Sequence, residues 1–568
     1  MRRAGRTWVV PDGPAPPWPG RSPVFAQVAR SRGLDPSGGE MVLRAPVERD
    51  PAGLEDMDRA VAVITETIAA GRPIAVYGDY DADGVTGCAL LVRTLTAAGA
   101  TVRPYIPNRE AEGYGLNSEA LVELDRAGIA TVVTVDCGTT ALDVAANRPP
   151  GQRLVVTDHH LPLAGPDGRQ RLAPADALVN PRRHDDRYGF KGLAGVGVAF
   201  KLAQALEATH LVPEGTARAQ LPLVALGTVA DCMPLTDENR WLVRSGLEQW
   251  PTAPPGLLAL AELAGCRRTP TSSDLAFSLA PRINAAGRME DAVVALTCCL
   301  ADDPAEARAA AAALEGLNQR RRTALTAALA IAHRQVDLAA DAPVIVCGDP
   351  GFPPGVVGLV AGRLAEEFGR PAFVHSESGE EWRGSARGVA GLNVVEVLQA
   401  CAPLLRRFGG HAAAGGFSLA ADATATAAFH RRLAEVVATA TGDRPPLRTF
   451  TVDAVCPLDR CTTQLADELS AFEPVGQGNP PVLLLATDLR VVATAAFGAS
   501  SQHLRVQLHD GTATAEALTF NRPGLRQHLP DGRRVDSLFV LEADEWRGRR
   551  RARLLLRDLR PAGLAPVG

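Results

Sequence analysis

The fold class follows from one segment, Pro73-Ile74-Ala75-Val76-Tyr77-Gly78-Asp79-Tyr80-Asp81-Ala82-Asp83-Gly84. Its first part is a short apolar run with β-branched and aromatic residues, which predicts a buried β-strand. Similar runs and helix-forming stretches alternate along the chain around it. The expected strands after the first are residues 101–106, 130–135 and 154–157, and the expected helices are residues 57–70, 85–98 and 118–127. This alternation indicates an α/β fold, in which helices cover a parallel sheet.

The chain of 568 residues is too long for one hydrophobic core, since single cores seldom exceed about 250–300 residues. A long stretch rich in Ala, Leu, Glu and Arg begins at Asp303-Pro304, which suit a helix N-cap and first position. Short alternating runs near the C-terminus predict a small β-barrel. The expected segments are a loosely structured lead-in at 1–45 with a short helix at 23–33, an α/β domain at 46–300, a connecting helix at 301–340, a second α/β domain at 341–443, and the barrel at 444–568 with strands at 483–485, 489–493, 504–508, 538–543 and 553–556.

Acidic and imidazole side chains recur where apolar runs end. They are Asp79, Asp81 and Asp83 after the first run, Asp136 after the run at 130–135, Asp158-His159-His160 after the run at 154–157, and Asp231 after an apolar stretch at 221–229. Ligand sites of open parallel sheets lie beyond the carboxyl ends of the strands, so we expect these four clusters to share one site. Alternate residues of an extended chain point the same way, so the first three carboxylates should converge.

Carboxylates this close together repel one another unless a cation neutralises them. Oxygen and imidazole ligands suit Mn²⁺ or Mg²⁺ better than a thiolate metal, and enough are present for two ions with one bridging aspartate. Any single aspartate after a strand is usually a turn former or a helix N-cap. Independent turns and helix caps do not readily explain so many Asp and His residues in these positions. We therefore predict a two-metal site of the kind used for phosphoryl hydrolysis.

Composition sets further limits. The formal net charge of −5 does not indicate a nucleic-acid-binding protein, although phosphate binding depends on local patches and bound cations would cancel part of this charge. The ten cysteines are scattered without a Cys-x-x-Cys pair, which indicates reduced thiols. No apolar run is long enough to span a bilayer, and residues 1–8 lead into no signal-peptide core. We expect a cytoplasmic protein without membrane contact.

The chain also resembles a known family from about residue 50 to its C-terminal end. Asp158-His159-His160 is similar to the motif that gives the DHH phosphoesterase superfamily its name, and the segment around Asp81 resembles the first motif of that superfamily. The motifs that resemble its RecJ branch are Tyr105-Ile106-Pro107-Asn108-Arg109, Glu112-Gly113-Tyr114-Gly115-Leu116, Pro281-Arg282-Ile283-Asn284-Ala285-Ala286-Gly287-Arg288, Gly384-Ser385-Ala386-Arg387, Phe408-Gly409-Gly410-His411 and Glu473-Pro474-Val475-Gly476-Gln477-Gly478-Asn479-Pro480. The resemblance implies a DHH domain, a DHH-associated substrate-binding domain and an OB-like nucleic-acid-binding barrel.

The resemblance also implies roles for single residues. The implied ligands of the two metal ions are Asp79, Asp81, Asp83, Asp136, His159 and Asp231. Some branches of the superfamily have a histidine at the position of Tyr77, and in RecJ-like members Asp79 takes its place. Asp158 would orient a histidine from outside the ligand set. The implied catalytic residues are His160, on the scissile phosphate, and Asp136.

Substrate contacts are implied in the same way. The residues concerned are Arg109, Arg282, Asn284, Arg288, Ser385, Arg387 and His411. Arg109, Ser385 and Arg387 would hold the 5′ phosphate, because a guanidinium binds phosphate oxygens bidentately. We expect the glycine-containing segment around Asn284 to be a polar loop, in which Asn284 suits a structural cap and a substrate contact equally. For Trp546, both base stacking and an ordinary solvated strand stay open.

The implied function is a 5′-to-3′ exonuclease that hydrolyses single-stranded DNA to nucleoside 5′-monophosphates in DNA repair and recombination. The implied partners are single-stranded DNA, a RecQ-type helicase and a single-strand-binding protein, and we expect a monomer. The main alternative is a DHH phosphodiesterase for short oligoribonucleotides or cyclic dinucleotides, which the long chain and the third domain disfavour. A non-catalytic replication scaffold should have lost the metal ligands. A family II pyrophosphatase normally lacks the region around Arg109 and the barrel.

Overall fold

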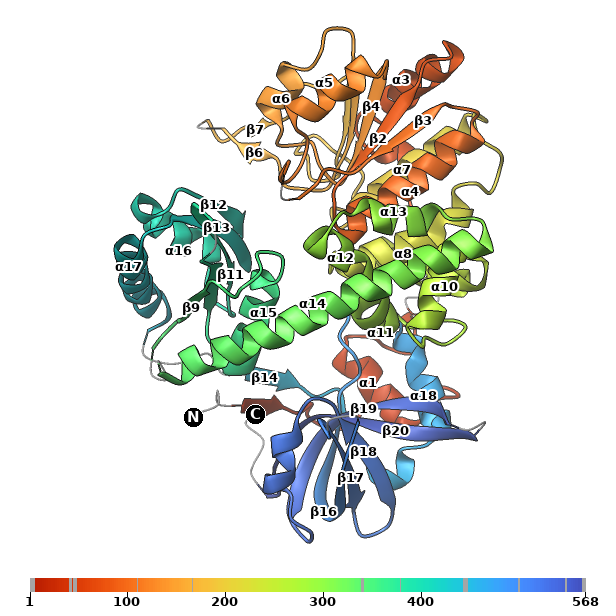
Figure 1. Cartoon of the computed structure of the whole chain (residues 1–568). Helices are drawn as coiled ribbons and strands as arrows, with labels where there is room; N and C mark the ends of the chain where they lie inside the picture. Colours follow the sequence, from red (N-terminus) through yellow and green to blue (C-terminus); the bar gives the residue numbers. More distant parts are fainter. Residues whose placement is uncertain are drawn as a thin grey trace.

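The structure is a computed structural model that describes residues 6–39, 43, 48–109, 111–165, 167–338, 342–377, 379–442, 448–498, 501–546 and 549–563. Figure 1 shows two α/β regions and a β-barrel region, with one long helix running between the α/β regions. No helix within those ranges combines the length and the apolar character that crossing a bilayer requires.

The first α/β region is built on a five-stranded parallel sheet. Its strands are β2 (Ile74–Gly78), β3 (Val102–Tyr105), β4 (Thr131–Val135), β5 (Arg153–Thr157) and β8 (Ala177–Val179), in the order β3-β2-β4-β5-β8. The expected helices are present as α3 (Met57–Ala69), α4 (Ala82–Ala97) and α5 (Ser118–Arg126). The chain goes from β2 to β3 on one side and returns to β4 on the other. The carboxyl ends of β2 and β4 therefore flank the switch point at which such sheets bind ligands.

The apolar stretch at 221–229 forms a helix and does not end a strand of the sheet. It is α8 (Leu221–Ala230), which packs against α4, α7 (Gly195–Ala208) and α9 (Asp237–Glu248). Every residue from 221 to 229 is buried. A helix that is buried on all sides has no polar face, so its sequence lacks the helical period and resembles a buried strand. Asp231 therefore approaches the sheet from the C-terminus of a helix.

A long helix leads into the second α/β region (Figure 1). It is α14 (Pro304–Leu338), and the Asp303 carboxylate caps it by accepting hydrogen bonds from the N–H groups of the second and third residues of the helix. The strands of the second region are β9 (Ile345–Asp349), β10 (Ala372–Ser376), β11 (Glu381–Arg387), β12 (Arg407–His411) and β13 (Ala414–Ala420), in the order β12-β13-β11-β10-β9. Its helices are α15 (Val357–Phe368), α16 (Val394–Ala400) and α17 (Ala423–Thr441). This sheet is mixed, since only β9 and β10 run parallel.

The C-terminal region is a β-barrel that closes through pairing of β16 with β19. Its strands are β15 (Ala454–Val455), β16 (Leu484–Phe497), β17 (His503–His509), β18 (Thr514–Thr519), β19 (Arg534–Trp546) and β20 (Arg549–Pro561). The runs expected at 483–485 and 489–493 belong to one strand, β16. The sequence of β18 has little strand-forming pattern, with Ala and Glu among its six residues, and it was not predicted. The prediction for Trp546 concerns a side chain outside the described residues.

The N-terminal residues pack on the barrel region. β1 (Arg6–Val9) pairs in parallel with β14 (Arg448–Thr451), and α1 (Pro23–Ser31) contributes to the barrel core with a fully buried Phe25. The described part of residues 1–45 is therefore not the loosely structured lead-in that its Pro- and Gly-rich composition predicts. Its few large apolar side chains are buried by a partner about 450 residues away, which no local pattern reveals.

Candidate active site

The first carboxylates come from the turn between β2 and α4. Asp81 caps α4, since its Oδ1 accepts hydrogen bonds from the N–H groups of Asp83 at 2.9 Å and of the next residue at 3.1 Å. The helix starts at Ala82, so the backbone is not extended through Asp83 and the expected reason for convergence is wrong. The carboxylate of Asp83 is held from outside the helix, by the first two N–H groups of α7 at 2.7 and 2.8 Å.

Two glycines let the main chain come close enough to gather these groups. A Cβ atom on Gly84 would lie 2.5 Å from the backbone N and O of Asp79. A Cβ atom on Gly195 would lie 2.5 Å from the Cβ of Asp136. Only glycine fits at both positions without moving a ligand.

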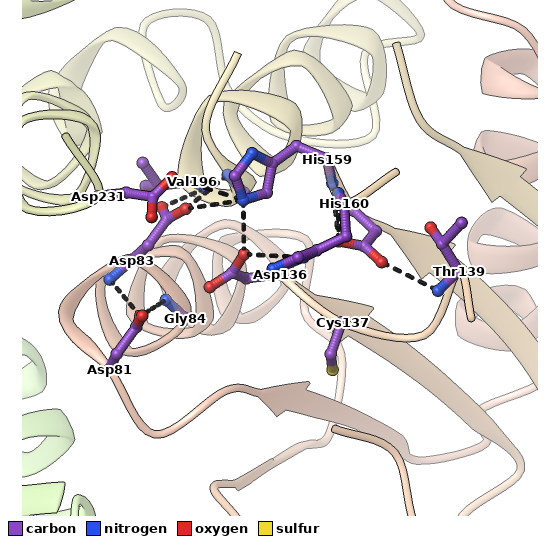
Figure 2. A network of polar contacts seen from close by, with 12 residues as sticks. Asp81, Asp83, Gly84, Asp136, Cys137, Thr139, His159, His160, Val196 and Asp231 are labelled. Atoms are coloured by element: carbon purple, nitrogen blue, oxygen red, sulfur yellow. Dashed lines mark hydrogen bonds and ion pairs between the residues drawn. The ribbon is translucent and has the colours of Figure 1, made fainter. Parts of the chain in front are cut away.

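Asp136 and His159 form the centre of the cluster. Asp136 follows β4 directly and has a φ of +62°, a backbone region that Asp enters more readily than most residues. His159 follows β5, and its Nε2 lies 3.0 Å from Asp136 Oδ1, 3.5 Å from Asp231 Oδ2 and 3.8 Å from Asp83 Oδ2. Figure 2 shows these side chains pointing toward one another from different elements. The structure thus brings together residues that lie far apart in the sequence.

Three overlapping groups of ligand atoms each lie within 4.8 Å of one another. The groups are Asp79, Asp81 and Asp136; Asp83, His159 and Asp231; and Asp136, His159 and His160. Asp136 and His159 each occur in two of them, so these two residues connect the groups. The Oδ1 atom of Asp79 is buried and has no hydrogen-bond partner among the described residues, an arrangement that is costly unless a cation supplies one. All six expected metal ligands lie in this cluster, with His160 beside them.

Burial makes these carboxylates hard to ionise in the absence of a cation. Burial and then repulsion by neighbouring carboxylates hold the pKa values of Asp79, Asp83 and Asp136 well above their usual range. The same two causes raise the pKa of Asp231 to about 7. Burial also lowers the pKa of His159 to about 3, so the imidazole is neutral at pH 7 and can act as a ligand. The electrostatics are those of a cation-binding site.

Cation binding at this site should become tighter as the pH rises, because the cation must displace protons from the carboxylates. Asp231, with a pKa of about 7, loses its proton between pH 6 and 8. We expect the affinity for Mn²⁺ to increase about tenfold or more over this interval. Isothermal titration calorimetry in two buffers of different ionisation enthalpy measures the affinity and the protons released. Asp231→Asn should reduce the pH dependence without abolishing it, because Asp79, Asp83 and Asp136 also hold raised pKa values. A wild-type affinity without pH dependence or proton release would contradict the assignment.

Asp158 orients His160 from behind the ligand cluster. Its buried Oδ1 lies 2.9 Å from His160 Nδ1, and its Oδ2 accepts the N–H of Thr139 at 2.9 Å. Burial opposes a charge on His160, but the hydrogen bond and the attraction of Asp158 outweigh it and raise the pKa of His160 to about 9. The hydroxyl of Tyr114 lies 3.0 Å from His160 Nε2, and the ring of His411 lies 6.5 Å from that of His160. An imidazolium therefore stands beside the carboxylates at neutral pH.

Positive charge gathers in the cleft beside the metal ligands. This cleft of about 1110 Å³ extends from Asp79 in the first α/β region to Ser385 and Arg387 in the second. Burial, followed by repulsion from Arg109, lowers the pKa of Arg387. Burial and nearby guanidinium groups, Arg109 first, lower the pKa of Arg288 to about 10. Guanidinium groups that repel one another around an open cleft fit a phosphate group, which would neutralise them.

The segment around Asn284 forms a helix, α12 (Ala280–Met289), and not the expected loop. Asn284 lines the cleft, and its Oδ1 also accepts the N–H of Ala82 at 2.8 Å at the start of α4. Arg282 points elsewhere, with its Nε 2.6 Å from Glu315 on α14, and it is not among the cleft residues. Residues two positions apart on a helix face different directions, which a loop prediction does not consider.

Some groups that build the site are difficult to recognise from the sequence. The N–H groups that hold Asp83 belong to the main chain, which every residue possesses. Asn180 donates hydrogen bonds to Thr139 Oγ1 and to the carbonyl oxygen of His160, both at 2.9 Å, and so supports the histidine segment. Tyr114 could have been recognised, since it lies within one of the quoted motifs.

Comparison with known proteins places the chain in a family. Residues 73–228 match the family model for the DHH family, N-terminal domain, residues 341–439 that for the DHHA1 domain, and residues 452–558 that for the RecJ OB domain. The single-stranded-DNA-specific exonuclease RecJ of Dickeya dadantii is 34% identical over 550 residues, which cover 91% of this chain and 93% of that protein. The chain belongs to the RecJ family.

Other RecJ proteins are longer than this chain. RecJ of Bacillus subtilis is 33% identical over 94% of this chain and 68% of its own length, and RecJ of Thermus thermophilus is 39% identical over 76% and 61%. The crystal structure of RecJ from Thermus thermophilus in complex with Mn²⁺ matches 99% of this chain and 81% of that chain, with a TM-score of 0.81 and 33% identity. The fold of this chain is therefore the RecJ fold over almost its whole length.

Proposed function

We propose that this chain hydrolyses single-stranded DNA from its 5′ end to nucleoside 5′-monophosphates, using two divalent cations. The observation that carries the proposal is a cleft lined by arginines that reaches Asp79 and Asp81, which belong to the cluster of carboxylates and imidazoles. Relatives named single-stranded-DNA-specific exonucleases support it, as does a RecJ structure in complex with Mn²⁺. We extend to this chain a role in DNA repair and recombination.

The donor set fits two hard divalent cations such as Mn²⁺ or Mg²⁺, which prefer carboxylate oxygens and accept a neutral imidazole. The ligands would be Asp79, Asp81 and Asp136 on one side, and Asp83, His159 and Asp231 on the other. The cations, when bound, make a water molecule acidic enough to supply hydroxide near neutral pH and offset negative charge on the phosphate. The chain's part is to hold the ligands and to keep Asp136 between the two groups.

His160 is proposed to act on the scissile phosphate. Its imidazolium can donate a hydrogen bond to a phosphate oxygen and stabilise the charge that builds up there during attack. Asp158 holds the ring through Nδ1, so Nε2 is the nitrogen proposed to contact the phosphate. The hydroxyl of Tyr114 contacts that nitrogen. When substrate binds, the hydroxyl would either move away from Nε2 or share this nitrogen with the phosphate.

The anion site accounts for the direction of digestion. Arg109, Ser385 and Arg387 are proposed to hold the terminal 5′ phosphate, and Arg387 Nη1 already donates to Ser385 Oγ at 2.8 Å. A strand held by this phosphate presents its first phosphodiester bond to the carboxylate cluster. Hydrolysis there releases one nucleoside 5′-monophosphate, and the shortened strand has a new 5′ phosphate for the next cycle.

The barrel is proposed to bind the strand beyond the cleft, as OB folds commonly do. We further propose that the chain works in the cytoplasm as a monomer. A RecQ-type helicase would supply unwound strands, and a single-strand-binding protein would cover them until they are degraded.

The proposed function is tested with single-stranded DNA that carries a label at the 5′ or the 3′ end. In the presence of Mn²⁺ we expect labelled mononucleotide from the 5′ label at once and from the 3′ label only at the end, with duplex DNA resistant. Early release of the 3′ label, or no release from either end, would refute the proposal.

Arg387→Ala should reduce kcat/KM about 10- to 100-fold on DNA with a 5′ phosphate, because hydrogen bonds to charged groups contribute about 1.5–3 kcal/mol. On DNA with a 5′ hydroxyl the same variant should change little. Arg363→Ala removes an arginine of α15 that is 60% exposed and serves as the matched control. An equal loss on both substrates would argue against a 5′-phosphate site.

A further inference from the structure

One sequence motif lies outside both the cleft and the metal-ligand cluster. It is the segment at 473–480, here called the docking loop, which lies within the match to the RecJ OB domain but packs on the first α/β region. The N–H of Leu235 donates to the carbonyl oxygen of Gln477 at 2.7 Å. A Cβ atom on Gly478 would lie 3.2 Å from Pro234 Cβ, and one on Gly476 would lie 2.7 Å from Leu235 Cδ1. The docking loop thus contacts the chain three and four residues after Asp231.

The docking loop has a defined shape of its own. Gly476 and Asn479 exchange main-chain hydrogen bonds of 2.8 and 3.3 Å. The side-chain amide of Asn479 donates to the carbonyl oxygens of Phe472 at 2.8 Å and Pro474 at 2.7 Å. These internal hydrogen bonds hold the loop in one shape, so that it can act as a firm support for its neighbour.

Two further contacts attach the loop to the first α/β region. The hydroxyl of the fully buried Ser272 accepts the N–H of Val475 at 3.0 Å and lies 2.7 Å from its carbonyl oxygen. The guanidinium of Arg240, on α9, donates to the carbonyl oxygens of Ala471 and Phe472 at 3.0 and 3.1 Å. The loop and the two residues just before it are therefore fixed to the first α/β region at several points that precede the contact of Gln477 with Leu235.

The position of the Asp231 carboxylate is set by the course of the main chain around it. The Asp83 carboxylate is held by two N–H groups, whereas no main-chain N–H of the described residues donates to the carboxylate of Asp231. The segment after Asp231 is tied down by Asn239, which is fully buried and donates to the carbonyl oxygens of Pro234 at 3.0 Å and Gly192 at 2.5 Å. The contacts that fix Pro234 and Leu235 therefore also fix the main chain at the end of α8, and with it the direction of the Asp231 side chain.

We propose that the docking loop is a positioning element of the metal centre. It supports the segment 232–235 from the barrel side, while Asn239 of α9 supports it from within the first α/β region, and together they keep Asp231 at 3.5 Å from His159. The barrel region then contributes to cation binding as well as to DNA binding. This inference rests on the proposed function in one respect, that Asp231 is a cation ligand.

Two glycine variants of the full-length chain test this inference. Gly478 has a φ of +72° and Gly532, elsewhere in the barrel region, has a φ of +84°, so alanine strains the backbone in a similar way at both. Only at position 478 would the new Cβ press on the first α/β region, since a Cβ at position 532 meets nothing within 4 Å. We expect Gly478→Ala to weaken Mn²⁺ binding about tenfold in calorimetry, as changes behind metal ligands commonly do. Gly532→Ala should bind Mn²⁺ like the wild type.

A 5′-phosphorylated trinucleotide, too short to extend from the cleft onto the barrel, gives the second readout. Gly478→Ala should lower kcat on it with little change in KM, which a role in DNA binding alone does not predict. If Gly478→Ala does not fold, Gly476→Ala takes its place, since it presses only on the flexible end of Leu235 and has an ordinary φ. If the folded variant binds Mn²⁺ and turns over the trinucleotide like the wild type, the inference about the docking loop is wrong and the proposed function still stands. If the wild-type protein neither binds Mn²⁺ nor hydrolyses the trinucleotide, the proposed function is wrong.

Discussion

Asp136→Asn is expected to reduce nucleotide release from single-stranded DNA by at least about a thousandfold in kcat, which corresponds to roughly 4 kcal/mol. Asp136 belongs to the ligand group of Asp79 and Asp81 and lies 3.0 Å from His159 of the other group, so the loss of its charge should affect both proposed cations. Asparagine keeps the size of the side chain and tolerates the φ of +62° at this position, so the fold should be retained. The measurement is single-turnover release of a 5′-labelled nucleotide in saturating Mn²⁺.

The stability of this variant gives an independent check. Burial and repulsion from neighbouring carboxylates raise the pKa of Asp136, so removing its charge should not lower the melting temperature of the cation-free protein. The increase in melting temperature on adding Mn²⁺ should become smaller. Asp143→Asn changes an exposed aspartate of the same region and should match the wild type in both respects. Nuclease activity of Asp136→Asn near the wild-type level would contradict the site.

Glu238→Gln is expected to destabilise the first α/β region by about 3–5 kcal/mol. Glu238 Oε1 lies 2.7 Å from Lys201 Nζ, and both side chains are inaccessible to solvent. Burial already lowers the pKa of Lys201, and Glu238 offsets this cost. Without the carboxylate the ammonium group stays buried with only neutral partners, such as the carbonyl oxygen of Arg49 at 2.9 Å. Urea unfolding should show the loss in the transition of this region, since a chain of several domains need not unfold in one step.

The double variant Lys201→Met with Glu238→Gln separates a lost charge pair from a lost packing contact. It should recover part of the stability, because no unpaired charge is left inside. Glu123→Gln is the matched control on the surface, where Arg103 and Glu123 form an exposed pair, and it should change stability by less than about 1 kcal/mol. Equal effects of Glu238→Gln and Glu123→Gln would show that the buried pair has no special importance.

The fold could be predicted where local pattern and environment agree. β2 and β4 are short apolar runs that become buried strands, and α14 begins with a cap and a proline. α8 could not be distinguished from a strand, because complete burial removes the polar face that reveals a helix. α1 could be predicted as a helix, but not its place on a barrel formed hundreds of residues later.

The ligand set could be predicted because its chemistry resides in side chains that stand out in the sequence. The geometry that unites the ligands could not, since it depends on main-chain groups. Asp83 is placed by N–H groups of α7, and a Cβ on Gly195 would collide with Asp136. The motif at 281–288 implies a substrate contact for Arg282, yet the turn of α12 directs this side chain to Glu315.

These carboxylates and imidazoles are proposed to bind a pair of divalent cations. Anomalous X-ray diffraction from crystals grown with Mn²⁺ would locate the ions. We expect two anomalous peaks per chain, one next to Asp79 and Asp81 and one next to Asp83 and Asp231, with Asp136 near both. A map without peaks among these residues, from crystals of protein that is active in the same Mn²⁺ solution, would contradict the proposal.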